Sequence, residues 1–342
     1  MKSEHLLALI GLALAVLVVA GCAGAKTTRK AADKRGLAYG TAIQPGDILW
    51  PESAQLLAQD FNTLVPENVM KWGLLRPTKT FWNWSDLDKM VDFAEKNGMK
   101  MRGHTFVWHS QNPPYVNSLK TRDEAIALMT EQITEVMTRY KGRIAEYDVA
   151  NEVVADNGTM RDTVWLKAIG SDYLDIAFRT ARAADPAAKL ILIDYSNEYA
   201  GDVKADAFYN LAKDLKERGV PIDGVGFQLH IEAQWPVRKD ALVANIRRFA
   251  ELGLAVSFTE IDVRIKMPVD AQKEAEQVRA YEALLDAALG EPNVKSFILW
   301  GYTDKQSWVP GFFGGYGSAL IYDTELKPKA AYHAILQRLL AK

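Results

Sequence analysis

Cysteine is almost absent from this chain of 342 residues: Cys22 is the only one, so no disulfide can form within the molecule. An excess of one charge is also missing. The 41 basic and 43 acidic side chains leave a net charge of −2, which argues against a nucleic-acid partner. The five histidines include no i, i+4 pair, and the chain has no phosphate-binding glycine loop and no Gly-x-Ser-x-Gly motif. We therefore expect neither a metal nor a cofactor.

Long apolar runs are confined to one place, the N-terminus. Lys2 is followed by the apolar stretch 6–20, which is too short for a comfortable membrane span and has the length of a signal-peptide core. The stretch ends in Val19-Ala20-Gly21-Cys22, which resembles a bacterial lipobox. Cleavage before Cys22 and lipidation of its thiol would follow. The alternative is an ordinary signal peptide with an incidental cysteine.

These features divide the chain into three expected parts. Residues 1–21 are predicted to be a signal peptide of the lipoprotein type, 22–36 a flexible lipidated tether, and 37–342 a single folded domain. The membrane would then be one partner, held through Cys22, and the protein would reside in the bacterial cell envelope, with the outer membrane or the cell surface favoured. We expect a monomer.

Beyond the tether, short apolar runs alternate with segments of helical period. Strands are expected at 37–42, 61–66, 100–107, 144–150, 189–194, 224–229, 254–259 and 296–300. Helices are expected at 52–59, 85–97, 122–139, 171–184, 203–218, 239–252, 271–289 and 329–340. This alternation predicts an α/β fold with parallel strands and crossover helices. An open, doubly wound sheet is the rival, but eight repeats without a glycine-rich dinucleotide turn favour a (β/α)8 TIM barrel.

Two of the expected strands lead into a glutamate. Residues 147–152 read Tyr-Asp-Val-Ala-Asn-Glu and residues 256–260 read Val-Ser-Phe-Thr-Glu, and each is the apolar run of a strand buried on both faces. Active sites of barrels lie at the carboxyl ends of the strands. Glu152 and Glu260 are therefore predicted to share one rim, and two carboxylates facing one cleft can hydrolyse a glycoside. The alternative is two structural glutamates in separate salt bridges.

Polar and aromatic side chains follow the other strands too. Asn151 is placed to donate to a sugar 2-hydroxyl, and His230 with Asp262 to orient the second glutamate. His104 and Lys71 suit donation to sugar hydroxyls. Each of these residues alone has an ordinary structural explanation, such as capping a loop or carrying a solvated charge. The walls of a sugar site are expected from Trp108, Trp300 and Trp308, although core packing is the usual fate of tryptophan.

Together these motifs resemble glycoside hydrolase family 10, the retaining endo-β-1,4-xylanases with a (β/α)8 barrel. The resemblance runs from about residue 37 to the C-terminus, and its most specific stretches are 65–72, 102–111 and 300–308. It implies that Glu152 is the acid/base and Glu260 the nucleophile, with Asn151, His230 and Asp262 in support. It also implies substrate binding by Glu67, Asn68, Lys71, His104, Trp108, Gln111, Gln228, Trp300 and Trp308.

One stretch departs from the pattern of that family. Family members usually carry Asn-Asp-Tyr-Asn after the fifth strand, whereas this chain has Ile193-Asp194-Tyr195-Ser196 and so lacks two amides. Asp194 and Tyr195 still fit the pattern, as does Glu198. The departure concerns the leaving-group side of the expected site and leaves the pair of glutamates untouched.

The sequence thus predicts a lipid-anchored xylanase that hydrolyses xylan by double displacement through a glycosyl ester on Glu260. The nearest alternative is a β-1,4-glucanase of the same mechanism, because a sequence does not give the pocket volume that would exclude the extra hydroxymethyl group of glucose. A second alternative is a non-catalytic, glycan-binding surface lipoprotein, although both carboxylates are present.

Overall fold

A computed structural model describes residues 26–341 of the chain. The expected signal peptide at 1–21 and the lipidation site at Cys22 lie outside these residues. Within the described part, no helix combines the length and the apolar character needed to cross a membrane.

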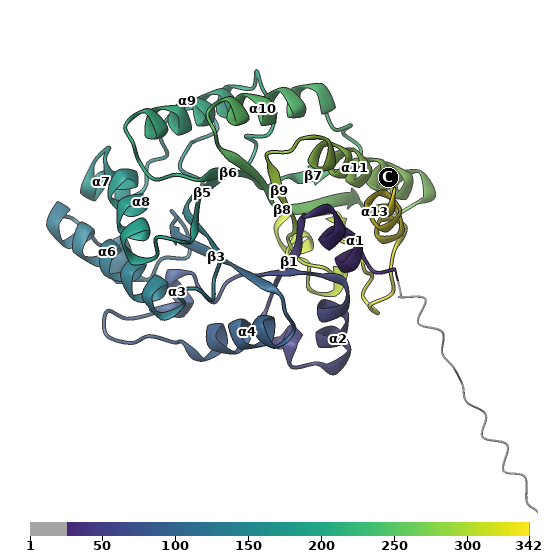
Figure 1. The fold of residues 1–342 in the computed structure, drawn as a ribbon, viewed down its shortest axis with the longest axis horizontal. Coiled ribbons are helices and arrows are strands. Elements are labelled where there is room, and N and C mark those ends of the chain that lie inside the picture. Colours follow the sequence, from purple (N-terminus) through teal and green to yellow (C-terminus); the bar gives the residue numbers. More distant parts are fainter. Residues whose placement is uncertain (1–25, 342) are drawn as a thin grey trace, which may run out of the picture.

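Eight parallel strands form a closed barrel, which confirms the predicted fold (Figure 1). Each strand pairs in parallel with the next around the ring, and β9 closes it by pairing with both β8 and β1. The barrel strands are β1 (Ala38–Ile43), β2 (Thr63–Pro66), β3 (Lys100–Val107), β4 (Glu146–Asn151), β5 (Lys189–Asp194), β6 (Gly224–Phe227), β8 (Ala255–Lys266) and β9 (Val294–Leu299). Because all eight run the same way, their carboxyl ends meet at one rim.

A ring of helices covers the outside of this barrel (Figure 1). The seven crossover helices are α2 (Pro51–Asp60), α4 (Ser85–Lys96), α6 (Arg122–Arg139), α8 (Tyr173–Ala184), α9 (Val203–Glu217), α10 (Lys239–Glu251) and α11 (Ala271–Gly290), and α13 (Ala330–Leu340) follows the last strand. Shorter helical turns are η1 (Pro45–Ile48), α3 (Trp72–Leu75), α5 (Pro114–Asn117), α7 (Val164–Ile169), η2 (Asp304–Gln306) and α12 (Val309–Phe312).

The hydrophobic pattern explains why these segments take these forms. In β5 every residue after Lys189 is buried, as expected for a strand that is covered on one face by helices and on the other by the barrel interior. In α8 the buried residues recur at helical spacing, so that one stripe faces the barrel. That stripe consists of Tyr173, Leu174, Ala177, Phe178 and Ala181. Full burial of one large apolar side chain contributes about 1.5–3 kcal/mol.

Strand β8 is longer than predicted. The sequence predicted a strand that ends at residue 259, but β8 continues to Lys266, so Glu260 and Asp262 lie within the strand rather than after it. Up to Phe258 its partner on one side is β6; beyond that point it pairs with the short strands β7 (His230–Glu232) and β10 (Tyr316–Gly317). The strand therefore rises above the barrel, and Glu260 lies where its pairing partners change.

The N-terminal helix α1 (Thr28–Arg35) corrects the predicted extent of the tether. The sequence predicted a flexible segment over 22–36, yet α1 is capped by the Thr27 side chain and contacts both α13 and β1. The guanidinium of Arg29 donates hydrogen bonds to the carbonyls of Ala58, Asn97 and Gly98 at distances of 2.7–2.9 Å. The ordered domain thus begins near residue 27. The small and charged residues of this segment suggested a flexible tether, because the sequence does not reveal the tertiary contacts that order α1.

The docking of α1 yields a stability prediction. Arg29→Ala removes three hydrogen bonds from a charged donor and should lower the free energy of unfolding by about 1–3 kcal/mol, as measured by urea denaturation. The control is Lys30→Ala, because Lys30 is exposed on the same helix and should be nearly neutral. Equal losses for the two variants would contradict the docking.

Candidate active site

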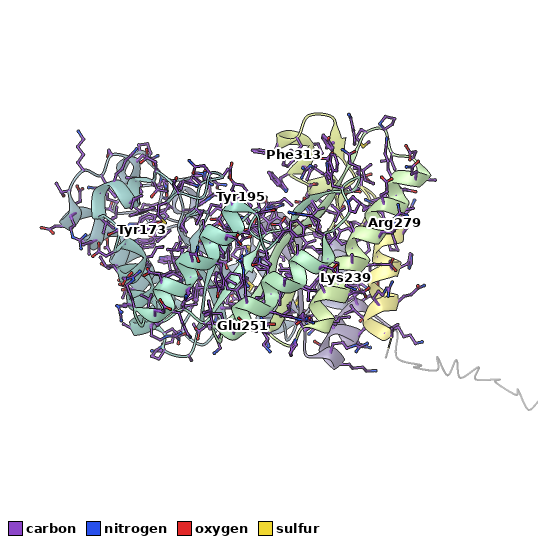
Figure 2. All side chains as sticks on the ribbon, turned by 90° about the horizontal axis from the view of Figure 1, so that it is seen from above. Tyr173, Tyr195, Lys239, Glu251, Arg279 and Phe313 are labelled. Atoms are coloured by element: carbon purple, nitrogen blue, oxygen red, sulfur yellow. The ribbon has the colours of Figure 1, made fainter. Side chains whose placement is uncertain are left out.

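All the predicted catalytic and substrate-binding residues lie at the carboxyl-terminal rim of the barrel. The labelled Tyr195 at the end of β5 and Phe313 in the loop after β9 stand at one edge of the molecule, whereas Glu251 at the end of α10 lies at the opposite edge (Figure 2). The predicted residues after β2 and β3 are Glu67, Asn68, Lys71, Trp108 and Gln111, and His104 belongs to β3 itself. The others come from β4 to β9 and their loops: Asn151, Glu152, Gln228, His230, Glu260, Asp262, Trp300 and Trp308.

Asn68 is the centre of the hydrogen-bonded group at β2 and β3. Its amide oxygen accepts from Lys71 Nζ and from Gln111 Nε2, both at 3.2 Å. Its amide nitrogen donates to Glu67 Oε1 at 3.2 Å, and Gln44 Nε2 donates to the other oxygen of Glu67 at 2.9 Å. Four of the predicted side chains therefore form one connected polar surface, which can donate to and accept from vicinal hydroxyl groups.

Two tryptophans frame the ammonium group of Lys71. Its Nζ lies 4.7 Å from the centre of the Trp108 ring and 5.6 Å from that of Trp300. His104 packs edge-on against Trp300 with ring centres 5.1 Å apart, and its Nδ1 lies 3.0 Å from the buried carboxylate of Asp148. The aromatic walls and the polar groups expected from the sequence thus meet at the same place.

Gln228 connects the two glutamates. Its Nε2 donates to Glu152 Oε1 at 3.1 Å and to Asn151 Oδ1 at 3.0 Å. Its backbone carbonyl accepts from the N–H of Glu260 at 3.1 Å. One residue after β6 therefore contacts both glutamates, one through its side chain and the other through its backbone. The side chain of Glu152 is 14% exposed and that of Glu260 is 6% exposed, so both are largely shielded from water.

His230 lies between two carboxylates. Its Nδ1 is 2.7 Å from Asp262 Oδ2, and its Nε2 is 3.3 Å from Glu260 Oε2. Trp308 Nε1 donates to the same oxygen of Asp262 at 2.8 Å. Burial of the imidazole disfavours its charged form, but Asp262 and Glu260 outweigh burial and raise the pKa of His230 to about 10. His230 is therefore an imidazolium at neutral pH and donates from both ring nitrogens.

Lys71 is a second positively charged group that acts on the carboxylates of the site. Burial lowers the pKa of Lys71, while the attraction of Glu260, Glu67 and Glu152 works in the opposite direction. All three carboxylates therefore attract its ammonium group. The ammonium group of Lys71 attracts both Glu152 and Glu260, and this attraction offsets part of the repulsion between the two carboxylates.

The structure adds three residues that the sequence did not assign to this site. Gln44 directly follows β1, and a polar residue at the carboxyl end of the first strand could have predicted its place in the site. His109 also belongs to the site: its Nδ1 lies 3.6 Å from Glu152 Oε2, and burial lowers the pKa of His109. Arg161 lies nine residues beyond Glu152 and donates a hydrogen bond to its backbone carbonyl, a contact that no sequence pattern predicts.

The departure after β5 is accommodated without the two missing amides. Ile193 is buried, and its backbone carbonyl accepts from the N–H of Glu152 at 2.9 Å, a bond that any residue type can make. Ser196 is exposed. Asp194 is fully buried beneath the half-exposed Tyr195. The position of Glu152 therefore does not depend on an amide at 193.

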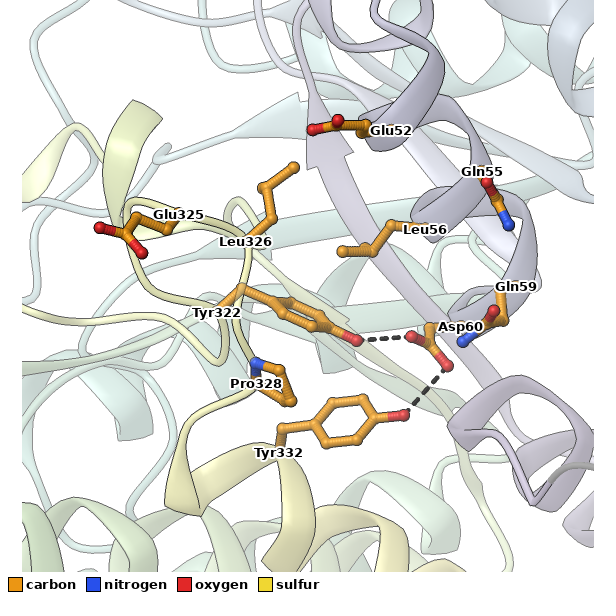
Figure 3. A pocket seen from close by; sticks show the side chains of 10 residues that line it. All are labelled: Glu52, Gln55, Leu56, Gln59, Asp60, Tyr322, Glu325, Leu326, Pro328 and Tyr332. Atoms are coloured by element: carbon orange, nitrogen blue, oxygen red, sulfur yellow. Dashed lines mark hydrogen bonds between the residues drawn. The ribbon is translucent and has the colours of Figure 1, made fainter.

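A separate cavity lies away from this rim. It is open to solvent, has a volume of about 440 Å³ and is lined by α2, the segment 322–328 and α13 (Figure 3). Its floor holds Asp60, which accepts hydrogen bonds from the hydroxyls of Tyr322 and Tyr332. None of the predicted site residues lines it. The catalytic chemistry therefore belongs to the rim and not to this cavity.

The His230 cluster generates a pH-dependent prediction. Because the folded pKa of His230 exceeds its ordinary value of 6.5, its charged form stabilises the fold fully below about pH 6.5 and progressively less as the pH rises towards about 10. Asp262→Asn should lower the pKa of His230 in an NMR titration. The stability lost relative to the parent protein should be largest near pH 6 and shrink towards pH 10. Asp270→Asn, at an exposed helix cap, is the control. A pH-independent loss would contradict the assignment.

Comparison with known proteins gives a consistent result. The profile of glycosyl hydrolase family 10 matches residues 27–338. Endo-1,4-beta-xylanase B of Thermotoga neapolitana is 37% identical over 340 residues, which cover 95% of this chain and 96% of that protein. Endo-1,4-beta-xylanase 1 of Humicola insolens is 37% identical over 327 residues, covering 94% and 76% respectively.

Solved structures agree with these relatives. The crystal structure of native xylanase 10B from Thermotoga maritima superposes with a TM-score of 0.88 at 40% identity and covers 92% of this chain and 98% of that one. Xylanase 10B from Thermotoga petrophila, solved in complex with xylobiose, gives the same TM-score and identity. The match from residue 27 includes α1 and nearly the whole described domain. This chain therefore belongs to glycosyl hydrolase family 10 and is an endo-1,4-β-xylanase.

Proposed function

We propose that the enzyme hydrolyses xylan by double displacement, with Glu152 as the acid/base and Glu260 as the nucleophile. The observation that carries this proposal is the connection through Gln228, whose side chain contacts Glu152 and whose backbone contacts Glu260. A retaining mechanism requires carboxyl groups about 5–5.5 Å apart on the two sides of the scissile bond. Two residues held by one intervening residue meet that requirement better than two independent loops would.

In the first step, a carboxylate oxygen of Glu260 attacks the anomeric carbon, and the bond from that carbon to the leaving oxygen breaks. Glu152 gives its proton to the leaving oxygen, so the shortened chain departs as a neutral alcohol. The sugar remains as an ester on Glu260. In the second step, Glu152 takes a proton from water, the water oxygen attacks the anomeric carbon, and the ester bond breaks to restore the Glu260 carboxylate.

The two oxygens of Glu260 have different environments that suit a nucleophile. Oε2 faces the imidazolium of His230, whereas Oε1 is buried and has no hydrogen-bond partner among the described residues. The oxygen without a partner keeps its lone pairs for the anomeric carbon. Trp308 and His230 both donate to Asp262 and so hold the imidazole in this orientation.

The remaining residues are proposed to bind the xylan chain. Glu67, Asn68 and Lys71 would hold the sugars on the side that stays with the nucleophile, with Gln111 further out. Trp108, Trp300 and Trp308 would form the walls of the reacting sugar's site, with His104 beside them. The related xylanase solved with xylobiose supports a xylo-oligosaccharide as the ligand of this surface.

Covalent trapping tests the assignment of the nucleophile. Incubation with a 2-fluoro-β-xylobioside that has a good leaving group should add one fluoroxylobiosyl unit to Glu260, identified by peptide mass spectrometry. The fluorine destabilises the transition state of the second step, so the ester accumulates. The variant Glu260→Gln should remain unlabelled. Labelling of any other carboxylate would overturn the mechanism.

We also propose that the chain is anchored to the bacterial cell envelope through a lipid on Cys22. The charged Lys2, the apolar stretch 6–20 and the motif at 19–22 support this proposal. Stable anchoring needs more than one acyl chain, which a lipidated N-terminal cysteine can carry. The outer membrane or the cell surface is the proposed location.

Metabolic labelling tests the anchor. When the full chain is produced in a bacterium supplied with radioactive palmitate, we expect label on the protein and recovery of xylanase activity with the membranes. Cys22→Ser should abolish both the label and the membrane recovery while the specific activity on xylan stays unchanged. Unlabelled, soluble parent protein would contradict the proposal and leave the ordinary signal peptide as the explanation.

A further inference from the structure

The backbone of Glu152 is strained. Its φ of 55° lies in the left-handed region, which costs a residue with a side chain about 1–2 kcal/mol. A strained residue keeps such a conformation only when its surroundings hold it there. The conformation also matters for orientation, because φ and ψ of Glu152 determine where its carboxyl group lies relative to β4. The contacts that hold this residue therefore bear on catalysis.

Arg161 holds this backbone from the far end of the same loop. Its Nε donates to the carbonyl of Glu152 itself at 2.7 Å. Its Nη2 donates to the carbonyl of Val154 at 3.1 Å and to the hydroxyl of Tyr195 at 2.9 Å. One planar guanidinium thus binds the strained residue, the loop two residues later and the end of β5. A lysine cannot reproduce this set of directed bonds.

A buried ion pair supports the same loop from below. Asp194 accepts from the N–H of Val154 at 3.0 Å, and Lys204 of α9 lies 2.9 Å from its other oxygen. The Lys204 side chain is 4% exposed, and its Nζ lies 3.0 Å from the centre of the Tyr195 ring. The Tyr195 hydroxyl in turn donates to Asp156 at 2.7 Å. Val154 and Tyr195, two of the three residues that Arg161 contacts, are therefore also held by other groups.

We propose that Arg161, backed by Asp194 and Lys204, is a positioning residue that aims the carboxyl group of Glu152 at the leaving oxygen. The inference rests on the proposed role of Glu152 as the acid/base. Arg161 itself exchanges no proton and touches no reacting atom. A misplacement of about 1 Å in a catalytic group can cost on the order of a hundredfold in rate, so a small relaxation of the loop is enough to be measured.

This role predicts a dependence on the leaving group that a purely structural role would not produce. Glu152 assists departure only where the leaving oxygen needs a proton. With aryl β-xylobiosides, Arg161→Met should leave kcat/KM nearly unchanged for 2,4-dinitrophenol and lower it at least about tenfold for phenol, a fraction of the full contribution of an acid. For the dinitrophenyl substrate kcat should fall together with KM, because Glu152 must still activate water in the second step.

Arg182→Met is the matched control. Arg182 also donates to two carbonyls, those of Pro186 and Ala188, and pairs with Asp223, but it lies at the amino-terminal end of β5. Arg182→Met should destabilise the fold to a similar extent, and it should change kcat/KM by the same factor for every aryl substrate. Melting temperatures of both variants separate stability from positioning.

Two further variants keep the inference testable if Arg161→Met folds poorly. Arg161→Lys retains the positive charge but not the three directed bonds, and it should show the same dependence on the leaving group. Lys204→Met should show it more weakly, because Lys204 acts through Asp194 and Tyr195. Equal losses for good and poor leaving groups in Arg161→Lys would overturn the proposal, as would unchanged rates for phenol.

Glu152→Ala distinguishes this inference from the proposed function on which it rests. If Glu152 is the acid, its removal should give the steepest dependence on the leaving group of the series. If that variant is as insensitive to the leaving group as the parent enzyme, Glu152 is not the acid, and the inference falls with it. If kcat/KM depends steeply on the leaving group in Glu152→Ala but no more steeply than in the parent enzyme in Arg161→Lys, the inference about Arg161 is refuted while the proposed role of Glu152 stands.

Discussion

The parallel closure of the barrel is the constraint on which the site depends. Because β9 pairs with both β8 and β1, no strand of the barrel ring is left at an edge, and every crossover must return to the amino-terminal end before the next strand begins. Residues separated by more than a hundred positions, such as Glu152 and Glu260, therefore arrive at the same rim. The short segment between β6 and β7 then joins the two through Gln228.

Within that rim, each of three positively charged side chains interacts with one or both of the catalytic glutamates. Lys71 interacts with three glutamates, His230 lies between Glu260 and Asp262, and Arg161 binds the backbone of Glu152. Buried charges are costly unless they are paired and hydrogen-bonded, so the cost of burying each charge offsets much of what its pairing contributes to stability. The benefit of this arrangement is that two catalytic carboxylates can lie in one shielded cleft, each with a defined set of neighbours.

Much of this could be predicted from the sequence, for identifiable reasons. Alternating apolar runs and helical segments predict a barrel, and the end of β4 at Asn151 places the carboxylate of the next residue, Glu152, at the rim. The extension of β8 past Glu260 could not be predicted, because it depends on pairing with β7 and β10, which are only three and two residues long. The docking of α1 and the reach of Arg161 likewise depend on tertiary contacts that leave no periodic pattern.

The position of α1 has a consequence for how an anchored molecule would sit. Besides α13 and β1, α1 contacts Asn62 and the turn at 97–98, which precede β2 and β3, so the chain enters the domain at the amino-terminal end of the barrel, opposite the rim that holds the two glutamates. Only five residues separate Cys22 from α1, and five extended residues reach at most about 18 Å. A lipid-bound enzyme would lie close to the bilayer, with the amino-terminal end of the barrel facing the lipid. The rim with the two glutamates would face the medium, where it can bind an insoluble polymer.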